Sequence, residues 1–256
     1  AINRASTTVA WNWKAGTSVS GNTTGSGTAK AYSGSVSTDA GFSIIGYVGN
    51  GTANHTLPHH LGVVPKMLII KNRTSSGYEW SIYHHTLGNQ KRMFLNDTSA
   101  VGSSNAYWNN TSPTSSVINL GGGGAVNENN SNMIAYCFAE KQGYSKFSSY
   151  IGNGDSDGTF VYTGFKPAFV IFKRSSGTGN WQLLDNKRLG YNVENHTIYP
   201  NSTIVEQDET DGDILSNGFK LRNTGTDGNG SGSTYIYMAF AENPFVTSSG
   251  VPATAR

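Results

Sequence analysis

The segment IAYCFAE, residues 134–140, is followed by a near copy, IYMAFAE, at residues 236–242. Other pairs of segments keep the same order and nearly the same spacing. They are YVGNG and YIGNG at 47–51 and 150–154, LGVVPKMLIIK and TGFKPAFVIFK at 61–71 and 163–173, Trp80 and Trp181, the looser pair Asn96 and Asn201, and Ile118 and Leu120 with Phe219 and Leu221. A chain that repeats its segments in order is built from duplicated structural units. The sequence therefore predicts two tandem repeats of roughly 100 residues, 41–143 and 144–246.

A third echo of the same segment stands at the start of the chain. VAWNWKAG, residues 9–16, aligns Val9, Trp11 and Trp13 with Ile134, Tyr136 and Phe138. We therefore expect residues 1–16 to be the last strand of an earlier repeat, and the chain to be the C-terminal piece of a longer protein. Residues 17–40 consist almost entirely of Ser, Thr, Gly, Ala, Val and Asn, which predicts a linker, extended or weakly stranded. Residues 247–256 form a short polar C-terminal tail.

Short apolar runs bounded by Gly, Asn, Ser and Thr recur along both repeats, and such runs are typical of β-strands. The predicted strands are 42–48, 66–72, 79–84, 92–96, 116–120 and 132–140 in the first repeat, and 147–151, 168–174, 180–185, 197–200, 217–222 and 234–242 in the second. No segment of helical length carries a helical apolar stripe. The predicted fold class is therefore all-β, with two tandem β-sandwich (jelly-roll-like) repeats preceded by the last strand of an earlier repeat.

The closing strand of the first repeat has two apolar faces of different size. Alternation places the bulky Ile134, Tyr136 and Phe138 on one face, and the small Ala135, Cys137 and Ala139 on the other. We expect a large core on the bulky side and close packing on the small side. Cys137 is then a small buried hydrophobic residue, and a role as a nucleophile is not expected.

Composition excludes several classes of partner. The formal net charge is +2 and no run of Lys or Arg occurs, which argues against a nucleic-acid surface. No apolar stretch of about 18 residues is present, so we expect no insertion into a membrane. Because the chain has one cysteine, Cys137, it cannot form an internal disulfide. Stability must come from packing or from association with other chains.

Two groups of residues are weak candidates for metal binding. His55, His59–His60 and His84–His85 could contribute ligands, but neighbours in a strand point to opposite faces and cannot chelate together. We therefore favour polar loop or surface histidines. The acidic groups Asp155/Asp157 and Asp208, Glu209, Asp211 and Asp213 could hold Ca²⁺, although the full calcium-loop pattern is missing. Solvated acidic turns are the favoured interpretation, and no metal or cofactor is expected.

The sequence shows no pattern typical of an enzyme. Glu140 and Glu242 recur at the end of the closing strand of each repeat, which favours a structural role in accepting hydrogen bonds from the backbone or from Lys. No Gly-x-Ser-x-Gly motif occurs, and GGGG at 121–124 lacks the following Lys-Ser/Thr of a phosphate-binding loop, so it is read as a hairpin tip. We expect no catalytic residues.

Aromatic residues are the remaining candidates for ligand recognition, because Tyr, Trp and Phe can stack on sugars or fill pockets at interfaces. Trp80 and Trp181 recur in both repeats and are assigned to the core. Tyr107 and Trp108, in AYWNNTSP at 106–113, have no counterpart in the second repeat. They are the candidate exposed contact residues, with a loop aromatic that caps the sandwich edge as an equally good interpretation.

Several of these segments resemble a family of virion proteins. GFSIIGYVGNGT, HHLGVVPKMLIIKNR, YWNNTSPTSSV, IAYCFAE and the ending IYMAFAENPF…ATAR look like a repeat domain of tail-fibre-like or structural virion proteins of marine bacteriophages, including cyanophages. VAWNWKAG also looks like the family's usual end of a preceding repeat, where a Cys often stands at the position of Asn12. The resemblance implies an all-β virion component and supplies no catalytic residue.

The expected function follows from this resemblance. It implies a tail fibre or appendage module that contacts the host surface, with polysaccharide as the expected ligand, other virion proteins as partners and homotrimerisation. Linked copies would strengthen weak sugar contacts. The alternatives are a capsid or tail decoration protein (head fibre) with a purely structural role and, less favoured, a polysaccharide depolymerase. In each case the expected location is the virion.

Overall fold

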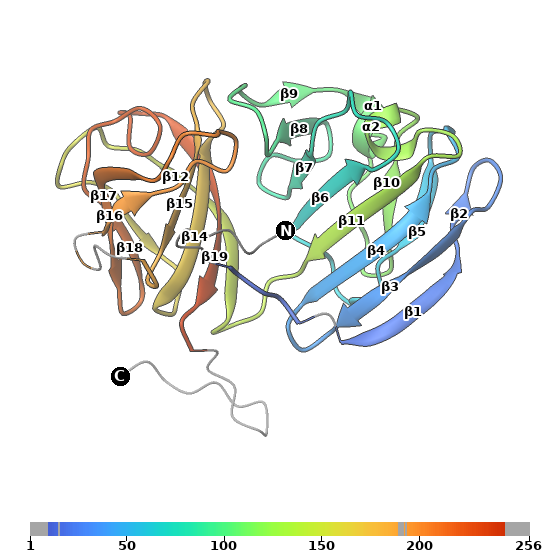
Figure 1. Ribbon diagram of the computed structural model, residues 1–256, viewed down its shortest axis with the longest axis horizontal. Coiled ribbons are helices and arrows are strands. Elements are labelled where there is room, and N and C mark those ends of the chain that lie inside the picture. Colours follow the sequence, from blue (N-terminus) through green and yellow to red (C-terminus); the bar gives the residue numbers. More distant parts are fainter. Residues whose placement is uncertain (1–9, 15, 189–191, 193, 244–256) are drawn as a thin grey trace.

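The computed structural model describes residues 10–14, 16–188, 192 and 194–243. Two β-sandwiches lie side by side, and the two helices are single short turns in the first sandwich (Figure 1). The prediction of an all-β sandwich fold is therefore confirmed. Within the described residues, no helix is long and apolar enough to cross a membrane.

The first sandwich pairs a sheet of eight strands with a sheet of three. Its elements are β1 (Thr17–Asn22), β2 (Thr24–Gly25), β3 (Ala31–Ser37), β4 (Phe42–Val48), β5 (His55–Pro58), β6 (Met67–Asn72), β7 (Ser81–His84), β8 (Lys91–Phe94), β9 (Gly102–Ser103), α1 (Asn105–Trp108), β10 (Val117–Leu120), α2 (Gly124–Asn127) and β11 (Asn132–Phe138). The larger sheet has the order β1-β3-β4-β11-β6-β7-β8-β9 and the smaller one β10-β5-β2. All of their strand pairings are antiparallel.

The second sandwich consists of two sheets of four strands. Its elements are β12 (Ser145–Ile151), β13 (Phe160–Tyr162), β14 (Pro167–Arg174), β15 (Trp181–Asp185), β16 (Glu194–Thr197), β17 (Gln207–Leu215), β18 (Gly218–Leu221) and β19 (Thr234–Ala241). The orders are β12-β19-β14-β15 and β13-β18-β17-β16. The first of these repeats the order β4-β11-β6-β7 of the first sandwich, and the pair β13-β18 repeats β5-β10. The duplication that the sequence predicts is therefore present in the topology.

Residues 17–40 correct the predicted domain boundaries. They were expected to form a linker, extended or weakly stranded, but they contain β1, β2 and β3 as members of the sandwich sheets. β3 pairs with β4, and β2 pairs with β5, so this segment extends both sheets of the first sandwich. The first sandwich thus begins at Thr17, not near residue 41. Ser, Thr and Gly serve here as exposed strand residues, a role that composition does not distinguish from a linker.

The start of the chain also differs from expectation. Residues 10–14 and 16 lie outside any strand, although we expected a terminal strand there. Trp11 and Trp13 instead pack between the two sandwiches. Residues 1–9 and 15 of that expected strand, and the predicted tail 247–256, lie outside the described residues.

The repeated YVGNG and YIGNG segments form the same latch in each sandwich. The hydroxyl of Tyr47 donates to the carbonyl oxygen of Val126 at 2.5 Å, and that of Tyr150 to Gly228 at 2.8 Å. Next to each tyrosine, two asparagines exchange hydrogen bonds. The pairs are Asn50 with Asn127 and Asn153 with Asn229. These bonds tie the segment after β4 or β12 to the residues that precede the closing strand, which explains why the motif occurs twice.

Three apolar cores hold the structure together. One lies inside each sandwich, and a third lies between the two sandwiches. The closing strand of the first repeat serves two of them, because Ala135 and Cys137 face the sandwich's own core while Phe138 faces the core between the sandwiches. In β19, Phe240 likewise faces the core between the sandwiches. The bulky faces predicted from alternation are therefore the faces by which the two repeats contact each other.

Candidate functional site

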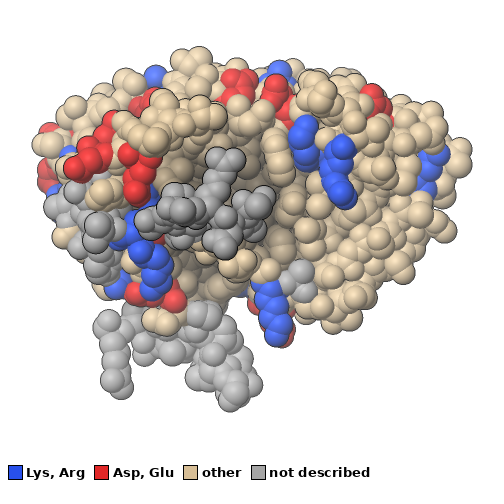
Figure 2. Space-filling view, viewed as in Figure 1, with Lys and Arg blue, Asp and Glu red and all other residues tan. Residues whose placement is uncertain are grey.

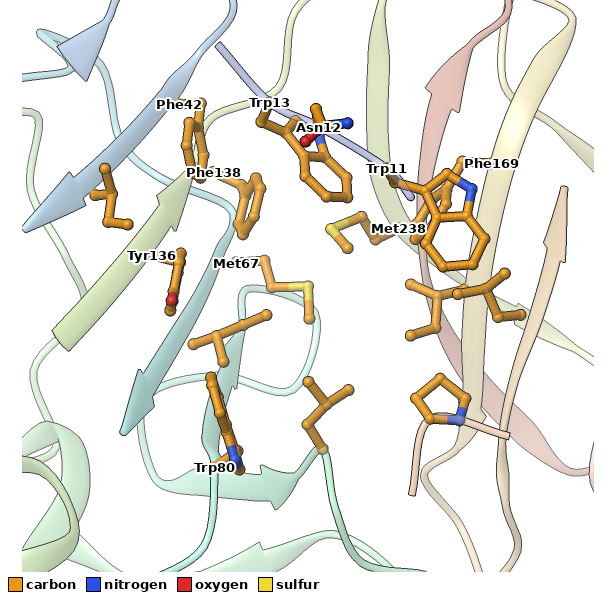
Figure 3. Close-up of a pocket in the computed structure, with 16 residues that line it drawn as sticks. Trp11, Asn12, Trp13, Phe42, Met67, Trp80, Tyr136, Phe138, Phe169 and Met238 are labelled. Atoms are coloured by element: carbon orange, nitrogen blue, oxygen red, sulfur yellow. The ribbon is translucent and has the colours of Figure 1, made fainter. Parts of the chain in front are cut away.

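A cleft of about 440 Å³ opens between the two sandwiches, in the core that they share. Figure 3 shows its two walls, with Trp80 and Tyr136 of the first repeat on one side and Phe169 and Met238 of the second on the other. Its lining is largely aromatic and aliphatic. Successive residues of β11 face opposite sides of the sheet. Ala135 and Cys137 face the core of the first sandwich, so Tyr136 between them points into the cleft.

One end of the cleft is filled by the N-terminal segment. The ring of Trp13 makes edge-on contacts with Phe169 and Phe240 of the second repeat, at 5.6 and 5.3 Å between ring centroids. It also contacts Phe138 of the first repeat at 6.1 Å. Such edge-to-face geometry is favourable between aromatic rings. Trp13 therefore joins the closing strands of both repeats (Figure 3).

At another point a buried lysine clamps the repeats together. Lys173, on β14, is fully buried, and its Nζ donates to the carbonyl oxygens of Thr98 at 3.0 Å and Ser99 at 3.2 Å in the first repeat. It also donates to the carbonyl oxygen of Arg174 at 3.1 Å. Burial lowers the pKa of Lys173 to about 8, while Asp227 and Asp97 act in the opposite direction.

The same contact includes an aromatic residue and two histidines. Trp181 Nε1 donates to the carbonyl oxygen of Phe94 at 2.7 Å. His84 Nε2 donates to the carbonyl oxygen of Tyr237 at 3.3 Å, and His85 Nε2 to that of Phe147 at 2.9 Å. Burial, followed by the proximity of His85, lowers the pKa of His84 to about 3, so the ring of His84 is neutral.

The histidines correct one expectation. His55, His59 and His84 are buried and were expected in loops or on the surface. Each takes part in local hydrogen bonds, as His55 does with Asn50 and Thr23. No cluster of three or more His, Cys, Asp or Glu side chains suited to a metal ion occurs within the described part of the chain.

The acidic group at 208–213 lies in a strand, not in the expected turn. It belongs to β17, where Asp213 forms an ion pair with Arg222 at 2.5 Å. Asp211 is buried and accepts hydrogen bonds from Thr197 and Asn223, and burial raises its pKa to about 6. In the other acidic group, Asp157 pairs with Lys220 at 2.5 Å.

Three residues take the structural roles predicted for them. Glu140 accepts hydrogen bonds from Lys146 Nζ at 2.9 Å and from the backbone N–H of Phe147 at 3.2 Å. Glu242 forms an ion pair with Lys166 at 2.8 Å. Cys137 is buried, and burial raises its pKa to about 12, which makes the thiol a poor nucleophile.

A family model described as a domain of unknown function, DUF7483, matches residues 1–244. The chain belongs to the DUF7483 family. The match covers both sandwiches and the cleft between them, so the pair of repeats is contained in one DUF7483 region. No curated protein and no solved structure is significantly similar to the chain.

Within this DUF7483 region, the predicted contact residues Tyr107 and Trp108 do not form an exposed pair. Trp108 is only 1% exposed, and its Nε1 donates to the carbonyl oxygen of Lys91 at 2.9 Å. It closes the core of the first sandwich from helix α1, which excludes it as a surface contact. Tyr107 is partly buried beside it, under the guanidinium of Arg92. The alternative interpretation, an aromatic that caps the sandwich edge, fits Trp108.

The DUF7483 cleft suits apolar contact better than chemistry. A ligand pocket that orients a polar substrate needs a few convergent polar groups, whereas the walls here are chiefly aromatic and aliphatic. Sequence reasoning assigned Trp80 to a core and missed that it lies at the wall of an open cleft. It also missed Lys173, although Lys71 and Lys173 align between the repeats, because a single Lys in a strand is ordinarily a surface residue.

Proposed function

We propose that this protein is a structural component of a bacteriophage virion, a module of a tail fibre or related appendage that contacts the surface of the host cell. The resemblance of its repeated segments to virion repeat domains motivates this proposal. Its location is then the virion, and its partners are other virion proteins and a surface glycan. A homotrimer is the assembly that we propose for such a fibre.

The observation that carries the proposal is the third core between the repeats. The faces of β11 and β19 meet in it, and His84 and Lys173 add polar bonds across it. An appendage must transmit force without bending at each repeat. Two sandwiches joined by a shared core meet this requirement better than two sandwiches on a flexible linker.

The surface fits contact with a neutral glycan. Figure 2 shows a face on which charged side chains are scattered among a majority of uncharged residues. A groove of about 370 Å³ is lined by Tyr162, Gln142, Glu140 and Lys146. Tyr162 is 64% exposed to solvent. An exposed ring beside hydrogen-bonding groups can stack on a sugar, so Tyr162 replaces Tyr107 and Trp108 as the proposed contact.

Binding to host cells tests this function directly. The purified full chain, fluorescently labelled, should bind cells of the phage's host strain and should bind more strongly when it is multimerised on beads. Tyr162→Ala should weaken this binding. Tyr32 does not line the groove, so Tyr32→Phe should leave the binding unchanged. Absence of binding even for the multimer would reject the attachment role.

The alternative is a decoration protein with a purely structural role, and the same shared core favours it. Electron microscopy of virions with a gold-labelled C-terminus separates the two, because a label on the head would favour the decoration role. A depolymerase role, the least favoured, requires release of reducing sugar from host polysaccharide.

A further inference from the structure

Lys71 and Lys173 hold equivalent places in the two sandwiches. Lys71 lies opposite Ile134 in the pairing of β6 with β11, and Lys173 lies opposite Ile236 in the pairing of β14 with β19. Since β11 and β19 are the closing strands of their repeats, the two lysines occupy equivalent points of two equivalent sheets. Their surroundings should therefore correspond if the contact between the repeats were symmetric.

The loops that follow β8 and β16 also start from equivalent anchors. Asn96 accepts a hydrogen bond from the backbone N–H of Trp80 at 2.9 Å, and Asn201 accepts the same bond from Trp181 at 2.7 Å. Counting from these anchors, Thr98 and Ser99 of the first loop correspond to Thr203 and Ile204 of the second. Each loop is thus fixed to its own repeat in the same way.

Beyond the anchor, the first loop crosses to the second repeat. Its carbonyl oxygens at Thr98 and Ser99 accept from Lys173, and the backbone N–H of Val101 donates to the carbonyl oxygen of Ser175 at 3.2 Å. The N–H of Gly179 donates back to Thr98 at 3.0 Å. These hydrogen bonds hold the first loop against the second repeat, so this half of the contact between the repeats is closed.

The other half is open. Lys71 donates to the carbonyl oxygen of Tyr78 in its own repeat at 2.5 Å. In the second loop, the side chains of Ile204 and Val205 are 56% and 77% exposed. The base of this loop is already at the cleft, because Pro200 lines it together with Trp80. A second hollow of about 450 Å³, which contains Lys71 and shares Trp80 with the cleft, continues the uncovered face.

We propose that this uncovered face, around Lys71 and Trp80, is the docking surface for the loop 202–205 of the same chain. In the docked state Ile204 and Val205 cover the mouth of the cleft, and the carbonyl oxygens of Thr203 and Ile204 accept from Lys71, as Thr98 and Ser99 do from Lys173. Removal of exposed aliphatic side chains from water favours this closure. An ammonium group has three donors, so Lys71 can make these bonds.

Engineered cysteine pairs test the docking in the full chain. The counterpart of Ser175 is Arg73, so Arg73→Cys is combined with Ile204→Cys in one variant and with Val205→Cys in another. Val101→Cys with Ser175→Cys is the positive control, because the backbones of these residues are hydrogen-bonded in the closed half. Ser18→Cys with Val205→Cys is the negative control. Buried Cys137 stays in place as an unreactive background. Melting of each reduced variant verifies that it is folded.

Under mild oxidation, we expect an intramolecular disulfide in the positive control and in at least one of the two test variants, but not in the negative control. A disulfide requires Cα atoms about 4.4–6.8 Å apart, so its formation reports direct docking. A positive control that links while both test variants stay reduced would overturn the proposal. So would linkage of the test variants only between chains, which would make a second copy the occupant.

Discussion

The ammonium of Lys173 lies 3.0 Å from the carbonyl oxygen of Thr98, so a buried cation of the second repeat is held by a loop of the first. This bond, with the apolar core around it, makes the contact between the sandwiches part of the fold. Polar bonds and the shared apolar core join the two sandwiches, and the repeated latch stabilises each sandwich from within.

Replacement of Lys173 by methionine should destabilise the protein. It removes three charge-assisted hydrogen bonds, each worth about 1.5–3 kcal/mol. Relief from burying an ammonium whose pKa falls from 10.5 to about 8 offsets about 3 kcal/mol of this. We expect a net loss of about 1–6 kcal/mol in the free energy of unfolding, measured in urea at pH 7. Lys14→Met, at an exposed position, is the control and should cost less than about 0.5 kcal/mol, so equal losses would contradict the assignment.

His84 should make stability depend on pH below neutrality. Its folded pKa of about 3 lies below the ordinary value of 6.5, so between these values the unfolded chain binds more protons. Stability therefore falls as the pH falls, by up to about 1.4 kcal/mol per pH unit from this group. Asp211, with its pKa raised to about 6, contributes the opposite slope.

A variant isolates the His84 contribution. Gln can still donate to the carbonyl oxygen of Tyr237 but does not titrate, so His84→Gln should lose less stability than the natural chain between pH 6 and 4. Urea unfolding at several pH values measures the difference. Parallel curves for the two proteins would show that His84 is not neutral and buried as described.

The latch should be equally important in both repeats. Asn127 and Asn229 each donate and accept in their asparagine pairs. Substitution of either by Ala leaves buried backbone groups without partners, at a cost of about 1–3 kcal/mol. We expect Asn127→Ala and Asn229→Ala to lower the melting temperature by similar amounts. A large effect in one repeat only would mean that the latch is structural in just that repeat.

Removal of the Trp13 ring should weaken the contact between the repeats. Complete truncation of a core Trp costs about 3–5 kcal/mol, and because Trp13 is only half-buried we expect roughly 2 kcal/mol. The loss is measured by urea unfolding. Lys14→Ala, at an exposed neighbouring position, is the control and should leave stability within about 0.5 kcal/mol. A Trp13→Ala variant as stable as this control would contradict the packing described.

Much of the fold could be predicted because alternation and repetition are local properties of the sequence. The spacing of IAYCFAE and IYMAFAE revealed the duplication, and alternation separated Phe138 from Cys137. Alternation does not say which neighbour a face meets, so the core between the repeats was not foreseen. That neighbour is set by how the two closing strands meet in three dimensions.

The remaining errors have physical causes of the same kind. Residues 17–40 look like a linker because edge strands can consist of Ser, Thr and Gly when few of their side chains are buried. Trp108 stands in an Asn-rich segment that suggests a loop, yet its ring fills the core of the first sandwich. Long-range packing decided both outcomes.

Differential scanning calorimetry of the full chain tests the central claim, that the shared core makes the two sandwiches one cooperative unit. We predict a single transition whose calorimetric enthalpy equals its van't Hoff enthalpy. Two separable transitions, or a calorimetric enthalpy about twice the van't Hoff value, would show that the repeats unfold independently and would contradict the claim.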